Sequence, residues 1–308
     1  GGSGTPVVST LDEAFEYLKA GQPVQLAAGT YNFAGSGIDG MSDDGVYTIT
    51  NNFDLSAAEG EVIINGCFAL GASSNGAPYS VKLNGINFQG SKDRFIEGTT
   101  ECQSPSIEVT DCEISGYGSS LLSTSSSSAA CTYGEVIFSN NYIHDIGAKA
   151  AGFQSRGGGD ITSLIFTNNV VSKSFREFIR IDDKSNVVTD KVDISNNTFS
   201  EITAGGESYF IRIQCTVTNG INVSKNVVVN TPVNGDGTKS QTYRFIDGST
   251  IKKSTLTTSA NFFFNCTHNW FDGIDQATST ANGGAVLSAD PLPNAASGNF
   301  TVTGEAAT

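Results

Sequence analysis

The stretch 164–199 decides the fold, because it carries LIFTNNVV at 164–171 and then VDISNNTF at 192–199. The same pattern, an alternating strand followed by Asn-Asn or Lys-Asn, also occurs as VIFSNNYI at 136–143 and INVSKNVV at 221–228. The second residue of the four pairs is Asn141, Asn169, Asn197 and Asn226, so the pattern recurs every 28 or 29 residues. A regular repeat of this length predicts a solenoid.

The repeat extends in both directions from this stretch. IEVTDCEI at 107–114 places Cys112, VKLNGINF at 81–88 places Ile86, and LTTSANFF at 256–263 places Asn261 in the same phase. These segments alternate with period two, are rich in β-branched residues and have no helical periodicity, which indicates strands. A turn that holds two or three short strands predicts a parallel β-helix. We expect the repeated Asn to form a side-chain ladder, because an unpaired buried amide is costly. The alternative is an Asn-rich turn without a ladder.

Composition excludes several classes of protein. The 308 residues carry a net charge of −14, and only 16% of them are charged. Because phosphate binding needs clustered Lys and Arg, we expect no nucleic-acid partner. No apolar run approaches the length of a membrane span, so we expect no transmembrane segment. The six cysteines form no CxxC or Cys/His cluster, which makes a zinc site improbable.

The N-terminal region has one helical pattern, STLDEAFEYLKAG at 9–21. Thr10 can cap this helix, Glu13 can complete a capping box and Gly21 can end it, so we expect a helix at about 10–20. It should cover the open end of the solenoid. We expect residues 1–8 to be a flexible leader, residues 9–308 to form one β-helix domain, and residues from about 282 to 308 to close it.

A second strand follows each Asn rung, and two of its copies place an arginine inside an apolar run. These are EFIRI at 177–181 and YFIRI at 209–213. Alternate residues of a strand face opposite sides, and charges cannot stack in a narrow apolar interior. We therefore expect Ile179 and Ile211 to point inward. Arg180 and Arg212 should point outward, together with a column of Phe. The alternative is that loops fold over the Phe column as a second small core.

The phase of the repeat also predicts one covalent bond. Cys102 lies nine residues before Asp111, and Cys131 lies nine residues before Asn140, at an equivalent rung position. The two cysteines should therefore stack on adjacent coils, within the Cα separation that a disulfide tolerates. The alternative is a pair of thiols in the same turn.

Three features resemble the pectin-lyase-like right-handed β-helix proteins: the short helix, the AGTY at 28–31, and the SNNYI and SNNTF rungs. This resemblance covers most of the chain and implies a single right-handed parallel β-helix. The tail ADPLPNAASGNFTVTG at 289–304 is similar to the closing segment of uncharacterised secreted β-helix proteins of glycan-degrading bacteria. The resemblance implies a secreted, periplasmic or cell-surface location.

One local stretch resembles the polysaccharide lyases of the chondroitinase-B and alginate-lyase type. EFIRIDDKS, SNNTF and FIRIQ follow one another in the order of that family. The resemblance implies that Lys184 is the base and Arg212 the positively charged assistant of a β-elimination next to a uronate carboxylate. It also implies calcium, with Glu177, Asp182 and Asp183 as candidate oxygen ligands. The sequence departs from the family because Arg180 interrupts the acidic segment and the spacing from Lys to Arg is longer.

Two functions remain open at this point. The first is an extracellular polysaccharide lyase, or a degenerate relative, acting on a uronic-acid polysaccharide. The second is a non-catalytic carbohydrate-binding or cell-surface structural protein. For either one the partner is a polysaccharide or oligosaccharide, and the candidate substrate-binding residues are Arg180, Phe178, Phe210, Glu97, Asp247 and Gln214.

Overall fold

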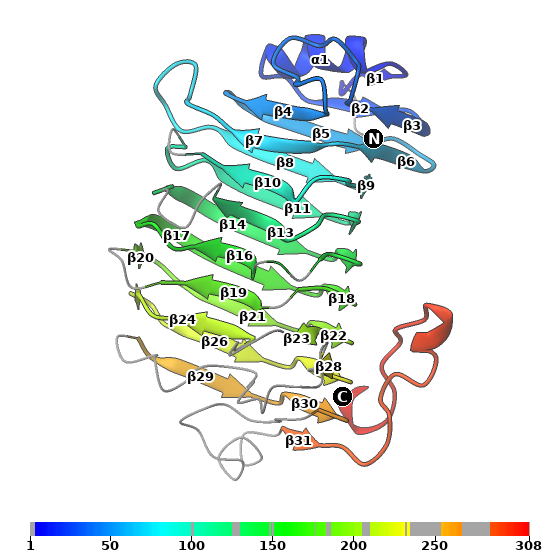
Figure 1. Ribbon diagram of the computed structural model, residues 1–308, viewed down its shortest axis with the longest axis vertical. Helices are drawn as coiled ribbons and strands as arrows, with labels where there is room; N and C mark the ends of the chain where they lie inside the picture. Colours follow the sequence, from blue (N-terminus) through cyan, green and yellow to red (C-terminus); the bar gives the residue numbers. More distant parts are fainter. Residues whose placement is uncertain are drawn as a thin grey trace.

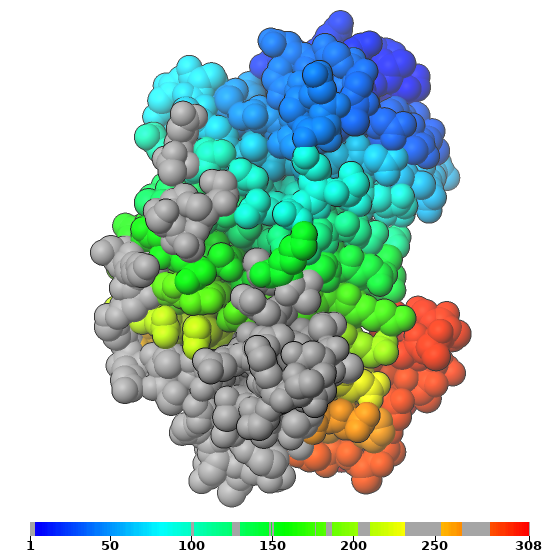
Figure 2. Space-filling model, in the orientation of Figure 1, coloured from blue at the N-terminus to red at the C-terminus, as the bar shows by residue number. Residues whose placement is uncertain are grey.

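The structure is a computed structural model in which the chain winds into a tall solenoid (Figure 1). It describes residues 4–99, 102–124, 130–147, 149, 151–175, 177–182, 186–204, 210–231, 233–234, 254–266 and 284–307. The described strands pair in parallel and build three long sheets, which confirms the predicted parallel β-helix. The space-filling view shows the same elongated body, with the colours following one another down its length (Figure 2).

The three sheets are named here in the order in which each coil visits them. The first sheet contains β1 (Val7–Val8), β2 (Val24–Leu26), β5 (Phe53–Ala57), β8 (Ser80–Asn84), β11 (Ser106–Thr110), β14 (Tyr133–Ser139), β17 (Gly159–Thr167), β21 (Val192–Ser195), β26 (Ile221–Ser224) and β29 (Leu256–Ser259), with β20 (Asn186–Val188) and β25 (Thr216–Val217) beside this path. The second sheet contains β3 (Gly29–Asn32), β6 (Val62–Asn65), β9 (Asn87–Gln89), β12 (Glu113–Ser115), β15 (Tyr142–His144), β18 (Val170–Ser172), β22 (Thr198–Ser200), β27 (Val227–Val229), β30 (Phe262–Phe264) and β31 (Ala285–Val286). The third sheet contains β4 (Val46–Ile49), β7 (Cys67–Leu70), β10 (Arg94–Gly98), β13 (Ser120–Thr124), β16 (Ala151–Ser155), β19 (Glu177–Ile181) and β24 (Ile211–Ile213). Outside these sheets, β23 (Thr203–Ala204) pairs with β28 (Val233–Asn234).

The N-terminal helix covers the top coil as predicted. Helix α1 (Leu11–Lys19) begins after Thr10, whose side-chain oxygen accepts a hydrogen bond from the Glu13 amide at 3.2 Å. Phe15 and Leu18 on the buried face of α1 belong to the apolar core. Phe15 packs against Tyr47 with ring centroids 4.6 Å apart. The helix therefore excludes water from the upper end of the solenoid.

The asparagine ladder is present and buried. Asn141 donates from its main-chain N and from its Nδ2 to Oδ1 of Asn169, both at 3.0 Å. The same pair of bonds joins Asn169 to Asn197, Asn197 to Asn226 and Asn226 to Asn261. Each Nδ2 group from Asn141 to Asn226 also donates to the main-chain carbonyl three residues before the equivalent position of the coil above. The predicted stacking of the repeat is thereby confirmed.

The residue before each ladder position explains the doubled Asn in the sequence. Asn140, Asn168 and Asn196 have φ values of 56°, 57° and 57°, in the left-handed region. Asn tolerates this region better than most residues with a side chain. The first Asn of each pair therefore makes the turn between the first and second sheets, and the second Asn satisfies the backbone inside it.

The phenylalanines of the third sheet face the interior, so the prediction that they point outward is wrong. Phe178 and Phe210 are 1% and 0% exposed, and their rings stack at 5.3 Å. The amides of Phe178 and Ile179 both donate to the Phe210 carbonyl, at 2.7 and 3.1 Å. This irregular pairing interrupts the strict alternation at the start of β19, so both side chains enter the core. The register also pairs Phe153 with Leu122 and Ile179, so Phe153 does not share a column with Phe178, as a single column of Phe would require.

The ends of the chain differ in part from expectation. Val7–Val8 forms β1 and pairs with β2, so the expected flexible leader does not include these two residues, and Val8 is buried against the core. Near the C-terminus, Leu292 packs on Val227 and Val229 of β27. This closing segment, with the 3-10 helices η1 (Ala295–Ser297) and η2 (Gly304–Ala307), lies beside the lower coils in Figure 1.

Cys102 and Cys131 lie on adjacent coils, as the phase of the repeat predicts. The next residues, Gln103 and Thr132, form a parallel bridge, and Cys102 Sγ donates to the Thr132 carbonyl at 3.2 Å. Both cysteines are nevertheless free thiols in the structure. The prediction of stacking is confirmed, and the predicted disulfide is not formed.

Candidate functional site

The outer face of the third sheet carries a column from the top coils to the lower ones that is polar at every position but one. Strand register aligns its members, one per coil, as Thr48, Ala69, Glu97, Ser123, Gln154, Arg180 and Arg212. Ile179 and Ile211, one position earlier, are buried in the core. The arginines therefore lie on the outer face while the isoleucines fill the interior, as predicted. Glu97 shares their column, three coils above Arg180.

A second column runs three positions earlier on the same strands and includes Arg94 in β10 and Glu177 in β19. Arg94 Nη1 lies 3.5 Å from Glu97 Oε2, and Arg180 Nη1 lies 3.8 Å from Glu177 Oε1. The two strands thus carry the same ion pair with the charges exchanged between columns. The strands between them carry only small or neutral side chains at these positions, including Ser123, which accepts a hydrogen bond from Arg94 Nε at 3.0 Å.

The lower end of this face is a charged group that we name the β19 cluster: Arg156, Glu177, Arg180 and Asp182. Asp182 accepts from Arg180 Nε and from Arg156 Nε, both at 3.0 Å, through different carboxylate oxygens. Glu177 and Asp182 are only 2% and 7% exposed. Arg212 follows Arg180 directly on the next coil. Gln214 is half-buried, and its main-chain N–H donates to the Ile181 carbonyl at 2.9 Å. The cluster therefore brings several of the predicted residues together around two adjacent arginines.

Calcium at Glu177 and Asp182 stays a prediction from the resemblance. Among the residues that the structure describes, no group of three or more His, Cys, Asp or Glu is placed to hold a metal. The carboxylates of Glu177 and Asp182 face arginines, so a cation would have to displace those contacts. Asp183, Lys184 and Asp247 lie outside the described residues. Phe178 and Phe210 are buried in the core and are not available to a ligand.

The upper end of the same face is hollowed into a groove that the repeat pattern of the sequence does not predict. Three adjoining cavities of about 430, 260 and 570 Å³ all include Lys92 in their walls. We name this hollow the Lys92 groove; its principal residues are Asp44, Val46, Ser91, Lys92, Arg94 and Glu97. Phe68 and Ala69 of β7 form part of its floor, and Asn32, Asn65 and Gln89 line one end.

Two turns shape the walls of the Lys92 groove. The turn 42–45 is closed by the Ser42 hydroxyl, which accepts from the Val46 amide at 2.9 Å, and by Gly45, whose φ is 91°. On the other side, the ring of Tyr117 lies where a side chain at Gly90 would be, since a Cβ there would come within 2.2 Å of it. Tyr117 also donates to the Gly66 carbonyl at 2.6 Å. Glycine at position 90 therefore lets the coils close beneath the groove.

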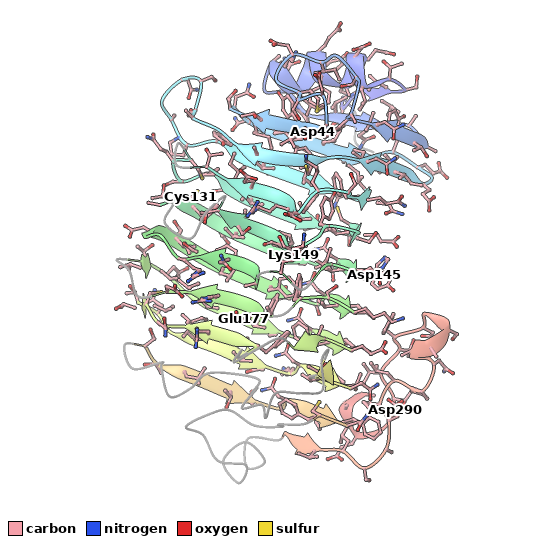
Figure 3. All side chains as sticks on the ribbon, viewed as in Figure 1. Asp44, Cys131, Asp145, Lys149, Glu177 and Asp290 are labelled. Atoms are coloured by element: carbon pink, nitrogen blue, oxygen red, sulfur yellow. The ribbon has the colours of Figure 1, made fainter. Side chains whose placement is uncertain are left out.

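Every cation in the groove wall is paired with a carboxylate. Lys92 Nζ forms an ion pair with Asp44. Arg94 is paired with Glu97, and the wall carboxylate Asp93 is paired through Oδ1 with Lys149 from a lower coil, at 3.2 Å. Asp44, Lys149 and Glu177 lie at successively lower levels of the solenoid in Figure 3. The groove thus presents many hydrogen-bonding groups but a balanced local charge.

The ion pair with Lys92 also limits what chemistry Asp44 can perform. Hydrogen bonds from Lys92 and then from Ser42 hold the pKa of Asp44 below its usual value, and the same pair raises the pKa of Lys92. A general acid in glycoside hydrolysis needs a carboxyl whose pKa is raised. Asp44 is therefore suited to accepting hydrogen bonds from a ligand and not to giving up a proton to one.

Beyond the groove, no helix among the residues described is both long and apolar enough for a membrane crossing. Compared with protein-family models, with curated proteins and with solved structures, the chain matches none of them.

Proposed function

We propose that this protein binds a neutral oligosaccharide or polysaccharide in the Lys92 groove, outside the cytoplasm, without cleaving it. The observation that supports this proposal is the combination of an open polar groove with cations that already have carboxylate partners. Sugar hydroxyls donate and accept hydrogen bonds, and sugar CH faces pack on apolar surface such as half-buried Val46. Hydrogen bonds to charged groups are stronger than those between neutral groups.

The charge balance favours a neutral ligand over an acidic one. A uronate would have to compete with Asp44 for Lys92 or with Glu97 for Arg94, and the protein as a whole carries a charge of −14. Long-range repulsion from an acidic protein adds to that local competition. A neutral glycan faces neither obstacle.

A direct binding experiment tests the proposal. Neutral oligosaccharides (gluco-, xylo- and manno-configured) and acidic ones (galacturonate and alginate) are titrated by calorimetry against the protein, Lys92→Ala and Lys82→Ala. Lys82 is the matched control because it is an exposed lysine on the outer face of the first sheet, between Asp54 and Glu108 of the neighbouring strands.

We expect at least one neutral oligosaccharide to bind, with an affinity that falls at least about tenfold in Lys92→Ala and stays unchanged in Lys82→Ala. Because the ligand is uncharged, its affinity should change less than about twofold when the salt concentration is raised. Binding of acidic glycans alone, or equal losses in the two lysine variants, would overturn the proposal.

A second candidate function is supported by Arg180 of the β19 cluster and by Arg212, which lies beside it on the next coil. Two adjacent arginines can neutralise a uronate carboxylate, which is what β-elimination requires. Lys184 as the base stays a proposal from the resemblance to polysaccharide lyases. Ultraviolet absorbance of unsaturated products from alginate, pectate or chondroitin, with and without calcium, measures this activity. It should vanish in Lys184→Ala and Arg212→Ala, and full turnover in Lys184→Ala would remove the lysine from that role.

A further inference from the structure

Cys102 and Cys131 are held as a matched pair where the third sheet connects to the first. The Gln103–Thr132 bridge sets the two coils in register immediately after the cysteines. Thr132 Oγ1 accepts from the Ser104 amide at 2.8 Å, and the Ser104 amide also donates to the Thr132 carbonyl at 3.0 Å. The two side chains are 3% and 1% exposed, and Cys102 Sγ donates to the Thr132 carbonyl at 3.2 Å. The pair is therefore fixed by backbone contacts on both coils.

The spacing of adjacent coils suits a covalent bond. Paired parallel strands lie about 4.8 Å apart, within the Cα separation of roughly 4.4–6.8 Å that disulfides span. Cys102 Sγ donates to the Thr132 carbonyl on the Cys131 coil at 3.2 Å, whereas Cys67 and Cys112 point at carbonyls of coils that carry no neighbouring cysteine, Gly45 O and Leu83 O, both at 3.7 Å. We propose that Cys102 and Cys131 are a modification site at which exchange with a small soluble disulfide, such as oxidised glutathione, cross-links neighbouring coils. This inference does not depend on the proposed function.

The local environment gives the two sulfurs different roles in the exchange reaction. The interaction with Cys102 lowers the pKa of the Cys131 thiol, and the same interaction raises the pKa of Cys102. The Cys131 thiolate would attack oxidised glutathione, break its S–S bond and release one glutathione thiolate. Cys102 would then lose its proton, attack the Cys131 sulfur and release the second glutathione. Two protein thiols are oxidised, and one glutathione disulfide is reduced to two thiols.

A close neighbour shows how tightly the pair is enclosed. A Cβ added at Gly98 would lie 2.9 Å from Cys131 Sγ and 2.2 Å from the Tyr133 hydroxyl oxygen. A small oxidant therefore cannot enter from this side while the coils are closed. We expect the exchange to be slow in the folded dithiol protein and fast while the chain folds.

The test is to refold the protein in a glutathione redox buffer or in excess dithiothreitol, alkylate the free thiols and map them by peptide mass spectrometry. We expect six alkylated cysteines after reducing refolding, and after oxidising refolding one Cys102–Cys131 link with the other four cysteines alkylated. Cys102→Ser should stop at a mixed disulfide of glutathione with Cys131, whereas Cys131→Ser should accumulate less adduct at Cys102.

Thermal unfolding provides a second measurement on the same samples. Because the bond closes the loop 103–130, the oxidised protein should melt several degrees above the reduced one, and this difference should be absent in Cys102→Ser. Six free thiols in folded protein from the oxidising buffer, or a link between any other two cysteines, would overturn the proposal. This mapping uses unaltered protein and so decides the question even if a variant fails to fold.

Discussion

At the scale of single residues, the ladder shows why Asn is required at one position of each coil. Asn169 accepts two hydrogen bonds through Oδ1 from Asn141 and donates two through Nδ2, to the Phe138 carbonyl and to Asn197. Asp has no donor to replace Nδ2. Asn169 is 1% exposed, so water cannot substitute for a missing partner.

Replacing Asn169 by Ala should therefore destabilise the protein by about 3 kcal/mol, because the main-chain N–H of Asn141 and the Phe138 carbonyl lose their hydrogen-bond partners inside the core. Equilibrium unfolding in urea measures this loss. The matched control is Asn168→Gly, which removes an exposed side chain at a φ of 57° that glycine readily adopts. Its effect should stay below about 1 kcal/mol. Equal effects of the two substitutions would show that the ladder contributes little.

At the scale of elements, the strands of the third sheet differ from simple alternating strands. The irregular pairing at the start of β19 brings Phe178 into the core beside Phe166 and Phe199, with ring centroids 4.5 and 5.3 Å away. Two residues later the same strand presents Arg180 to the outer face. One short strand thus serves an aromatic core and a charged surface.

Truncation of Phe178 to Ala should cost about 3–5 kcal/mol, as for other buried aromatic side chains, whereas an aromatic ring on the surface would cost far less. The control is Ile165→Ala in β17, since Ile165 is a half-buried residue on the outer face of the first sheet. We expect the control to lose less than about 1.5 kcal/mol by the same unfolding measurement. A loss in Phe178→Ala no larger than in this control would contradict the interior position of the ring.

At the scale of the whole molecule, stacking buries titratable groups along the length of the solenoid. Burial raises the pKa of Cys67 to about 11, of Cys112 to about 12 and of Cys266 to about 11. In the unfolded chain the pKa of these thiols is about 8.5. The unfolded state therefore releases protons that the folded state retains, and stability declines as the pH rises above the unfolded value.

We expect the urea midpoint to be constant between about pH 7 and 8 and to fall progressively between about pH 8.5 and 11. Replacing Cys67 by Ala removes one of these groups and should make the decline shallower, even though the variant is less stable at neutral pH. A midpoint that does not fall in alkali, or a slope unchanged in Cys67→Ala, would contradict the raised pKa of that thiol.

The sequence by itself determined the repeat, the ladder, the capping helix and the outward direction of Arg180 and Arg212. These features follow from periodic, local patterns: a ladder position recurs every coil, and a charge in an apolar strand must face outward. Because the same pattern recurs in every coil, parallel pairing aligns equivalent residues of neighbouring coils without any further signal in the sequence. Stacking of Cys102 on Cys131 follows for the same reason, although the bond between them does not.

The tertiary structure alone decided where the phenylalanines point and where the groove lies. The inward position of Phe178 depends on two amides that share one carbonyl of the next coil, and strict alternation cannot anticipate such a break. The Lys92 groove depends on turns that the repeat does not specify, and its central ion pair joins Lys92 to Asp44, 48 residues away. Periodicity fixes what every coil shares, whereas a binding surface comes from the turns in which one coil differs from the next.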